Sequence, residues 1–106
     1  MKELFYLKSR SNLYEAIAEY DGTKLIVKKG SRINNTPSEK FKASKKLMNK
    51  RADSSLVDKE GNLITNVEFT SFSTAATFVA GHVANGLLSW KTKDKKTAKD
   101  YFDELK

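Results

Sequence analysis

Apolar and polar residues alternate through the first quarter of the chain, which is typical of strands that face a core on one side only. Leu4 to Leu7 is a short apolar run, and Leu13 to Tyr20 places tyrosine and alanine on one face and two glutamates on the other. Asp21-Gly22 follows, and this pair favours a two-residue hairpin turn because both central positions adopt a positive φ. Thr23 to Lys29 is the expected returning strand. The pattern therefore predicts an antiparallel sheet.

Three later segments have helical spacing. Glu39 to Ala52 gathers its apolar residues within about half of the helix circumference. The opposite arc carries Lys42, Lys45, Lys46 and Lys50. An alanine-rich helix follows the hydroxyl-rich turn at residues 69–74 and stops at Gly81, a residue suited to the left-handed conformation. Thr97 caps the last helix. Residues 56–57 and 63–64 flank a polar turn and indicate a second hairpin.

Asn85-Gly86 and Trp90 come between the second and third of these helices. Asn-Gly favours a tight turn with positive φ, which would carry the chain up to Trp90 into a strand or an extended segment. A lone tryptophan can stack a base but is more often buried, because its apolar area is large. Together the segments predict an α+β fold, a small antiparallel sheet built from hairpins with about three short helices packed on it.

Composition narrows the class of protein further. The chain has 106 residues, of which 39% are hydrophobic and 10% aromatic, so we expect one domain with a single core spanning residues 1–106. Cysteine is absent, which excludes disulfides, thiol catalysis and cysteine-rich zinc sites. The first apolar run is too short for a signal peptide, and no segment reaches transmembrane length. We therefore expect a cytoplasmic protein that does not bind membranes.

The residue types that enzymes need do not form recognisable patterns. His82 is the only histidine, so no histidine cluster can hold a metal. Ser71, His82 and Asp94 supply the residue types of a catalytic triad, but no nucleophile-elbow sequence accompanies them. Lys28 to Ser31 lacks the spaced glycines of a phosphate-binding P-loop. We therefore expect a protein that is not an enzyme and that uses no cofactor or metal.

Positive charge is concentrated in two segments of a chain whose net charge is +7. Lys24 to Arg51 contains ten lysine or arginine residues and a single acid, and Lys91 to Lys96 contains four lysines and a single acid. Segments of this kind attract a polyanion such as nucleic acid from beyond contact distance. The alternative is a solvated surface that keeps the protein soluble, and charge by itself does not decide between the two.

Hydroxyl groups surround the start of the alanine-rich helix. Ser71 or Ser73 can cap it, and its first turn contains no carboxylate to neutralise the positive end of the helix dipole. Such a helix start suits a backbone phosphate, whereas plain capping is the simpler explanation of the serines. The candidate nucleic-acid-binding residues are Lys28, Lys29, Arg32, Lys42, Lys46, Ser71, Ser73, Thr74, Asn85 and Lys91.

The order of residues from 69 to 91 resembles a known family. The motif consists of Phe69-x-Ser71-x-Ser73-x-Ala75-Ala76, Val79-x-Gly81, Asn85-Gly86 and Trp90-Lys91. It resembles the DUF4357 family, a domain of unknown function that is often found C-terminal to GIY-YIG nuclease domains. It is also similar to the RAMA domain, named for its association with restriction enzymes and adenine methylases. The segments Phe5–Ser9 and Val27–Arg32 fit the opening strands of that family, so the resemblance spans nearly the whole chain.

The resemblance implies an α+β accessory domain that works beside DNA-acting proteins and reads duplex DNA, including modified DNA. Three positions depart from the family's pattern. Phe72 replaces the proline of a Ser-Pro-Ser sequence, His82-Val83 replaces an Arg-Ser pair, and Leu87 replaces a tryptophan. If the family's arginine grips a phosphate or a base edge, His82 is a poor substitute for it, and if the family's tryptophan stacks on a ligand, Leu87 removes that surface. The implied fold is unaffected by these changes, whereas the implied ligand site depends on them.

Two functions follow from these observations. The first is a small basic, non-catalytic accessory module that binds nucleic acid, with any specificity coming from Asn85-Gly86 or from the loop at residues 31–35. The second is a protein-interaction or structural domain that docks on a nuclease, a methylase or another acidic partner, its lysines serving only solubility. Salt dependence separates them, because counterion release makes phosphate binding weaken steeply with salt.

Overall fold

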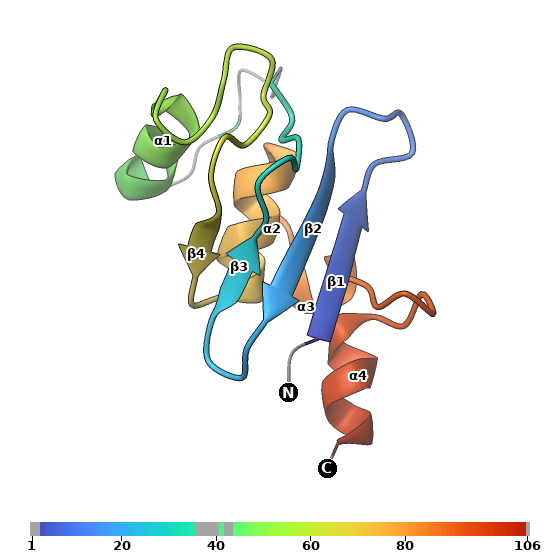
Figure 1. Cartoon of the computed structure of the whole chain (residues 1–106). Helices are drawn as coiled ribbons and strands as arrows, with labels where there is room; N and C mark the ends of the chain where they lie inside the picture. The colour runs from blue at the N-terminus through green and yellow to red at the C-terminus, as the bar shows by residue number, and fades with distance from the viewer. Residues whose placement is uncertain (1–2, 36–40, 42–43, 106) are drawn as a thin grey trace.

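The computed structural model describes residues 3–35, 41 and 44–105, and within these ranges the chain forms four strands and four helices (Figure 1). The strands are β1 (Glu3–Lys8), β2 (Glu15–Tyr20), β3 (Leu25–Val27) and β4 (Val67–Phe69). The helices are α1 (Lys45–Ala52), α2 (Phe72–Ala80), α3 (Gly86–Ser89) and α4 (Ala98–Glu104). The predicted α+β class is confirmed. None of these helices is long and apolar enough to cross a lipid bilayer.

The strands form one antiparallel sheet in the order β1-β2-β3-β4. Figure 1 shows α2 lying behind this sheet and leaving the opposite face open. Phe5, Ala18 and Val27 are fully buried on the helix side, whereas Leu4 and Ile17 on the other side are about 40% exposed. The two-residue alternation of the sequence therefore separates a core face from a solvent face, as predicted.

The first hairpin is present, but its turn lies one residue further along than predicted. Tyr20 pairs with Leu25, and the N–H of Asp21 donates to the Lys24 carbonyl, so Gly22 and Thr23 are the central residues. Gly22 has a φ of 104°, whereas Asp21 is not in the left-handed region. The Asp21 carboxylate instead accepts the N–H groups of Thr23 and Lys24, which is how an aspartate at the first position of a turn stabilises it.

Helix α1 begins later than Glu39, the predicted start. The Ser44 hydroxyl accepts the Leu47 N–H and caps the helix, so its first residue is Lys45. Phe41 lies outside the helix, and Glu39 and Lys42 are not among the described residues. The predicted core-facing residues of this segment are Phe41, Leu47, Met48 and Ala52; Leu47 is buried, Phe41 and Met48 are half-buried, and Ala52 is exposed. The apolar periodicity predicted too early a start for the helix, because it takes no account of Ser44 as a helix cap inside the periodic segment.

The region between α1 and α2 contains the predicted second hairpin and one strand that was not predicted. Val57 pairs with Leu63 in an isolated bridge, and the Ile64 N–H donates to the Leu56 carbonyl. Strand β4 pairs with β3 through Val67 and Phe69. Three residues are too few for alternation by itself to distinguish a strand, and it is the pairing with β3 that defines β4.

Trp90 is fully buried, as predicted, and it lies beside a cluster of aromatic rings that attaches α4 to the sheet. Phe5 contacts Tyr101 edge-on with ring centres 5.4 Å apart, and Phe72 meets Phe102 in the same way at 5.4 Å. Edge-to-face contacts of this kind add to the stabilisation that burial provides. Thr97 caps α4 by accepting the Asp100 N–H, which confirms the predicted helix start.

The predicted turn at Asn85-Gly86 is wrong. Asn85 caps the short helix α3 by accepting the Leu87 N–H, and Gly86 is the first residue of that helix. Gly86 is not among the glycines with positive φ. Leu87 and Leu88 therefore lie in a helix and not in the predicted strand or extended segment, whereas the Trp90 backbone is extended. Asn-Gly is compatible with both structures, because asparagine is also a preferred helix cap.

Candidate nucleic-acid interface

The motif residues between 69 and 91 bond to one another around the first turn of α2. The Gly86 N–H donates to the Ser73 hydroxyl at 3.0 Å, and the Trp90 indole N–H donates to the Phe72 carbonyl at 3.1 Å. A Cβ atom on Gly86 would lie 2.0 Å from the Phe72 carbonyl carbon, so only glycine permits this approach of the two backbones. The motif therefore fixes the position and direction of the α2 N-terminus.

Each hydroxyl near the α2 start has a different role. Ser71 caps the helix by accepting the Thr74 N–H at 3.2 Å, and Ser73 holds α3. Thr70 and Thr74 line the cleft described below, and both residues are exposed. No acidic residue lies in the first turn of the helix, as predicted. The positive end of the helix dipole therefore faces this side of the molecule without an internal counter-charge.

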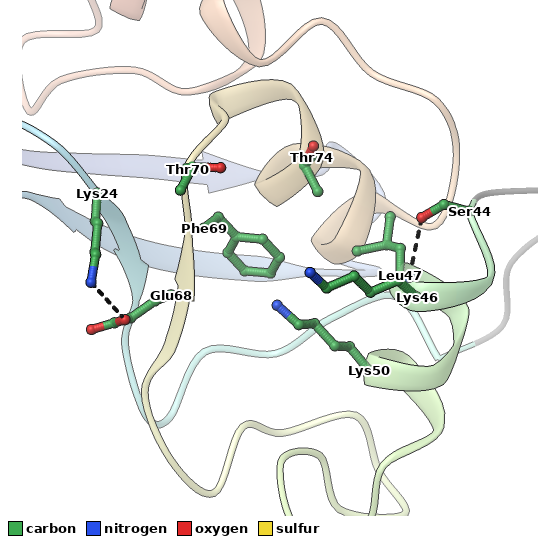
Figure 2. A pocket seen from close by; sticks show the side chains of 9 residues that line it. All are labelled: Lys24, Ser44, Lys46, Leu47, Lys50, Glu68, Phe69, Thr70 and Thr74. Carbon is green, nitrogen blue, oxygen red and sulfur yellow. Dashed lines mark hydrogen bonds and ion pairs between the residues drawn. The ribbon is translucent and has the colours of Figure 1, made fainter.

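A cleft of about 370 Å³ separates α1 from β4 and the start of α2 (Figure 2). We call it the α1–α2 cleft. Its lining residues are Lys24, Ser44, Lys46, Leu47, Lys50, Glu68, Phe69, Thr70 and Thr74. Figure 2 shows the ammonium groups of Lys46 and Lys50 extending from α1 toward Phe69, with Thr74 on the facing helix. Two sequence predictions, the lysine arc and the hydroxyl-rich helix start, thus meet in one place.

The α1–α2 cleft has an excess of positive charge. Lys46 and Lys50 form no ion pair with any described residue, and the Lys50 ammonium lies 4.8 Å from the centre of the Phe69 ring. The one lining acid, Glu68, pairs with Lys24 at 3.4 Å. That pair is about half exposed on both sides, so it neutralises charge and adds little stability. Three lysines and one glutamate leave a cleft suited to an anion.

The opposite end of α2 is held by an arginine. The Arg51 guanidinium donates to the carbonyls of Phe78 and Asn34, and the Asn34 side chain donates to the Ala80 carbonyl. The bonds to the Phe78 and Ala80 carbonyls satisfy groups that the last turn of α2 leaves without partners. Burial lowers the pKa of Arg51 from its usual value. Arg51 therefore joins α1 to α2.

The other predicted site residues lie elsewhere. Lys28 and Lys29 line a hollow on the open sheet face, where Lys28 pairs with Glu19 at 3.7 Å. Arg32 donates to the backbone and side chain of Asn12. The backbone of Lys91 pairs with the backbone of Tyr6 at the outer edge of β1, which is the edge of the sheet opposite to β4 and the α1–α2 cleft. Lys42 is outside the described residues.

Of the ten predicted residues, the cleft thus contains Lys46 and Thr74. Asn85 and Ser73 make the structural contacts given above. The fold adds Lys24, Lys50 and Thr70 to the cleft, and none of these three is among the ten predicted site residues. Lys50 shares the lysine arc with Lys46, and this periodicity was the available signal for it. Lys24 gives no such signal, because only the pairing of β3 with β4 brings it to Glu68.

The three departures from the family's pattern can also be located. Phe72 is the half-buried first residue of α2. His82, Val83 and Leu87 are exposed, and Val83 is the most exposed large hydrophobic residue described. His82 contacts the Val83 carbonyl through its Nδ1 at 3.2 Å. Among the described residues, no group of three or more histidine, cysteine, aspartate or glutamate side chains is placed to hold a metal ion.

Comparison with known proteins gives one match. No curated protein and no solved structure matches the chain significantly. A family model described as "Domain of unknown function (DUF4357)" matches residues 5–102. The matched range contains the whole sheet apart from its first residues, the α1–α2 cleft and the motif that fixes the start of α2. The chain therefore belongs to the DUF4357 family of domains of unknown function.

Proposed function

We propose that this domain is a non-catalytic module that binds duplex DNA, with a backbone phosphate held in the α1–α2 cleft. One observation carries the proposal. Lys46 and Lys50 extend from α1 toward Phe69, in the cleft that Thr74 of the first turn of α2 also lines, and that turn has no acidic residue. Lysine ammonium groups and a helix N-terminus both favour phosphate, and here they converge from two elements that are far apart in sequence.

The proposed contacts differ in what they contribute. Lys46 and Lys50 supply charge, and the exposed hydroxyls of Thr70 and Thr74 supply short-range hydrogen-bond donors. Phosphate contacts of this type fix position and affinity but carry no base sequence. Phe69 is 4% exposed, so it forms the floor of the cleft and is not a stacking surface. The α1–α2 cleft is therefore proposed as a site for the DNA backbone and not for its bases.

Fluorescence anisotropy of a labelled DNA duplex across a salt series tests the proposal. Lys46→Gln/Lys50→Gln removes two charges from the cleft, and the Lys59→Gln/Lys99→Gln control removes two exposed charges from other elements. If both cleft lysines contact phosphates, the log–log salt slope falls by about 1.8, at about 0.9 per phosphate. The control keeps the slope of the unaltered protein. Equal slopes for the two double variants would refute the cleft as the DNA site.

A protein partner is the second candidate, and one observation favours it. Leu4 and Ile17 on the open sheet face are 41% and 42% exposed, and they line a hollow together with Lys28 and Lys29. Exposed apolar side chains beside lysines suit an acidic protein, such as a nuclease or a methylase, better than they suit DNA. In this case Ile17→Asp would abolish co-purification with that partner, while DNA would show no binding at low salt.

A further inference from the structure

A second basic hollow lies at the opposite edge of the sheet. We call it the edge groove. It has a volume of about 600 Å³ and is lined by Tyr6, Lys8, Ser89, Lys91, Thr92, Lys93 and Lys95. A volume of this size is within the range of about 300–1,000 Å³ that ligand sites occupy. The edge groove shares no residue with the α1–α2 cleft.

Backbone hydrogen bonds build the edge groove. Lys91 pairs with Tyr6 in both directions, at 2.7 and 3.0 Å, and thereby extends the outer edge of β1. The loop that follows is closed by bonds from the Thr92 N–H to the Lys96 carbonyl and from the Lys95 N–H to the Thr92 carbonyl. In Figure 1 this loop, coloured orange to red, projects beyond β1. The lysine positions are therefore set by the fold and not by a flexible tail.

The charge in the edge groove is almost uncompensated. Lys91, Lys93 and Lys95 form no ion pair with any described residue, and all three are exposed. Lys8 pairs with Glu15 at 3.4 Å, but both side chains are more than half exposed. Lys95 has a φ of 69°, a conformation that a lysine rarely adopts. Four lysines therefore surround one hollow that contains no lining acid.

Tyr6 distinguishes the edge groove from a plain basic surface. It is half-buried at the outer strand, opposite Ile17, and it is the one aromatic ring among the groove's lining residues. An aromatic ring beside several lysines offers both a stacking surface for a base and charges for the flanking phosphates. A base paired within a duplex is already stacked on its neighbours and cannot reach such a ring. The groove thus favours an unpaired strand.

We propose that the edge groove binds a single strand of nucleic acid, with one base stacked on Tyr6 and the flanking phosphates held by Lys91, Lys93 and Lys95. This inference rests on the proposed nucleic-acid function for its ligand class, but it concerns a different surface. The domain would then hold duplex at the α1–α2 cleft and an unpaired strand at the edge groove. The ligand would then be DNA that contains a junction between a duplex and a single strand.

Anisotropy with a labelled ten-nucleotide oligothymidine tests the proposal beside the duplex titration. Lys93→Gln/Lys95→Gln changes two exposed residues, and it is expected to lower the single-strand salt slope by about 1.4, at about 0.7 per phosphate. Tyr6→Leu is expected to weaken oligothymidine binding about tenfold, whereas Tyr6→Phe, which keeps the ring, retains it. Duplex binding stays unchanged in all three variants. Lys46→Gln/Lys50→Gln is the matched control, because it removes two lysines from the α1–α2 cleft and none from the edge groove.

Each outcome decides a separate point. Oligothymidine binding that survives Lys93→Gln/Lys95→Gln at full strength and full salt slope overturns the edge groove as the site. Parallel losses for oligothymidine and duplex overturn the preference for an unpaired strand. Binding of a polyglutamate peptide in place of oligothymidine would show that the ligand is an acidic protein segment, which also overturns the inference. If the protein binds oligothymidine but not the duplex, the proposed function of the α1–α2 cleft is refuted and the inference about the edge groove stands.

Discussion

Replacing Gly86 with alanine tests whether the family motif acts by backbone contact. A Cβ atom at this position would lie 2.0 Å from the carbonyl carbon of Phe72, 2.1 Å from its oxygen and 2.3 Å from the Ser73 nitrogen. Ordinary contacts begin at 3.4 Å, so the backbones would have to separate by 3.4 − 2.0 = 1.4 Å. Because all three atoms are backbone, no side chain can rotate to relieve the overlap.

The expected loss of stability follows from what that separation breaks. The Gly86–Ser73 and Trp90–Phe72 hydrogen bonds, at 3.0 and 3.1 Å, do not survive a shift of this size. Each contributes about 0.5–1.5 kcal/mol net, and the loosened packing of Trp90 adds a cost typical of core disruption. We expect Gly86→Ala to reduce the free energy of unfolding by about 3–5 kcal/mol. That is a large share of the 5–15 kcal/mol typical of a domain.

Urea unfolding followed by Trp90 fluorescence measures this loss, and Gly30→Ala is the matched control. Gly30 has a φ of 91° but no atom within 4 Å of the added Cβ, so its substitution costs only the left-handed strain, about 1–2 kcal/mol. If Gly86 served a turn with positive φ, the two variants would be destabilised equally. An equal loss would therefore refute the backbone-contact explanation and restore the turn that the Asn-Gly pair suggested.

Three further predictions concern the supports of the candidate site. Trp90→Phe removes the donor to the Phe72 carbonyl and leaves a small cavity, so we expect the free energy of unfolding to fall by about 2 kcal/mol. Urea unfolding followed by circular dichroism measures this loss, and an unchanged midpoint would contradict the role of that bond. Arg51→Ala removes the two hydrogen bonds to the Phe78 and Asn34 carbonyls, with an expected loss of about 2–3 kcal/mol. Arg51→Lys recovers only part of this loss, because lysine lacks the planar fork. The Asp21 carboxylate accepts the N–H groups of Lys24 and Thr23, which lowers its pKa from 3.8 to about 2. A lowered folded-state pKa stabilises the protein above pH 3.8, and this stabilisation is lost as the pH falls toward 2. An NMR titration midpoint near 3.8 for Asp21 would contradict this account, and Asp21→Asn should flatten the change in stability between pH 4 and 2.

The sequence predicted those elements that are stabilised by residues close to one another along the chain. The hairpin at residues 15–27, the Thr97 cap and the stop of α2 at Gly81 each depend on residues within a few positions of one another. Gly81 has a φ of 75°, the left-handed conformation expected of it. The errors have the same origin. The start of α1 and the Asn85-Gly86 turn each had two local solutions, and periodicity or pair preference selected the wrong one.

Patterns within the sequence were enough to predict the α+β class, the burial of Trp90, the absence of acids from the first turn of α2 and the family to which the chain is similar. Which charges share a site depends instead on how the chain folds. The α1–α2 cleft combines Lys24 of the β2–β3 turn, Lys46 of α1 and Thr74 of α2, which are brought together by strand pairing and by the Arg51 contacts. Strand pairing and helix packing act between residues that are distant along the chain, so no local pattern in the sequence encodes which of the twenty basic side chains will converge.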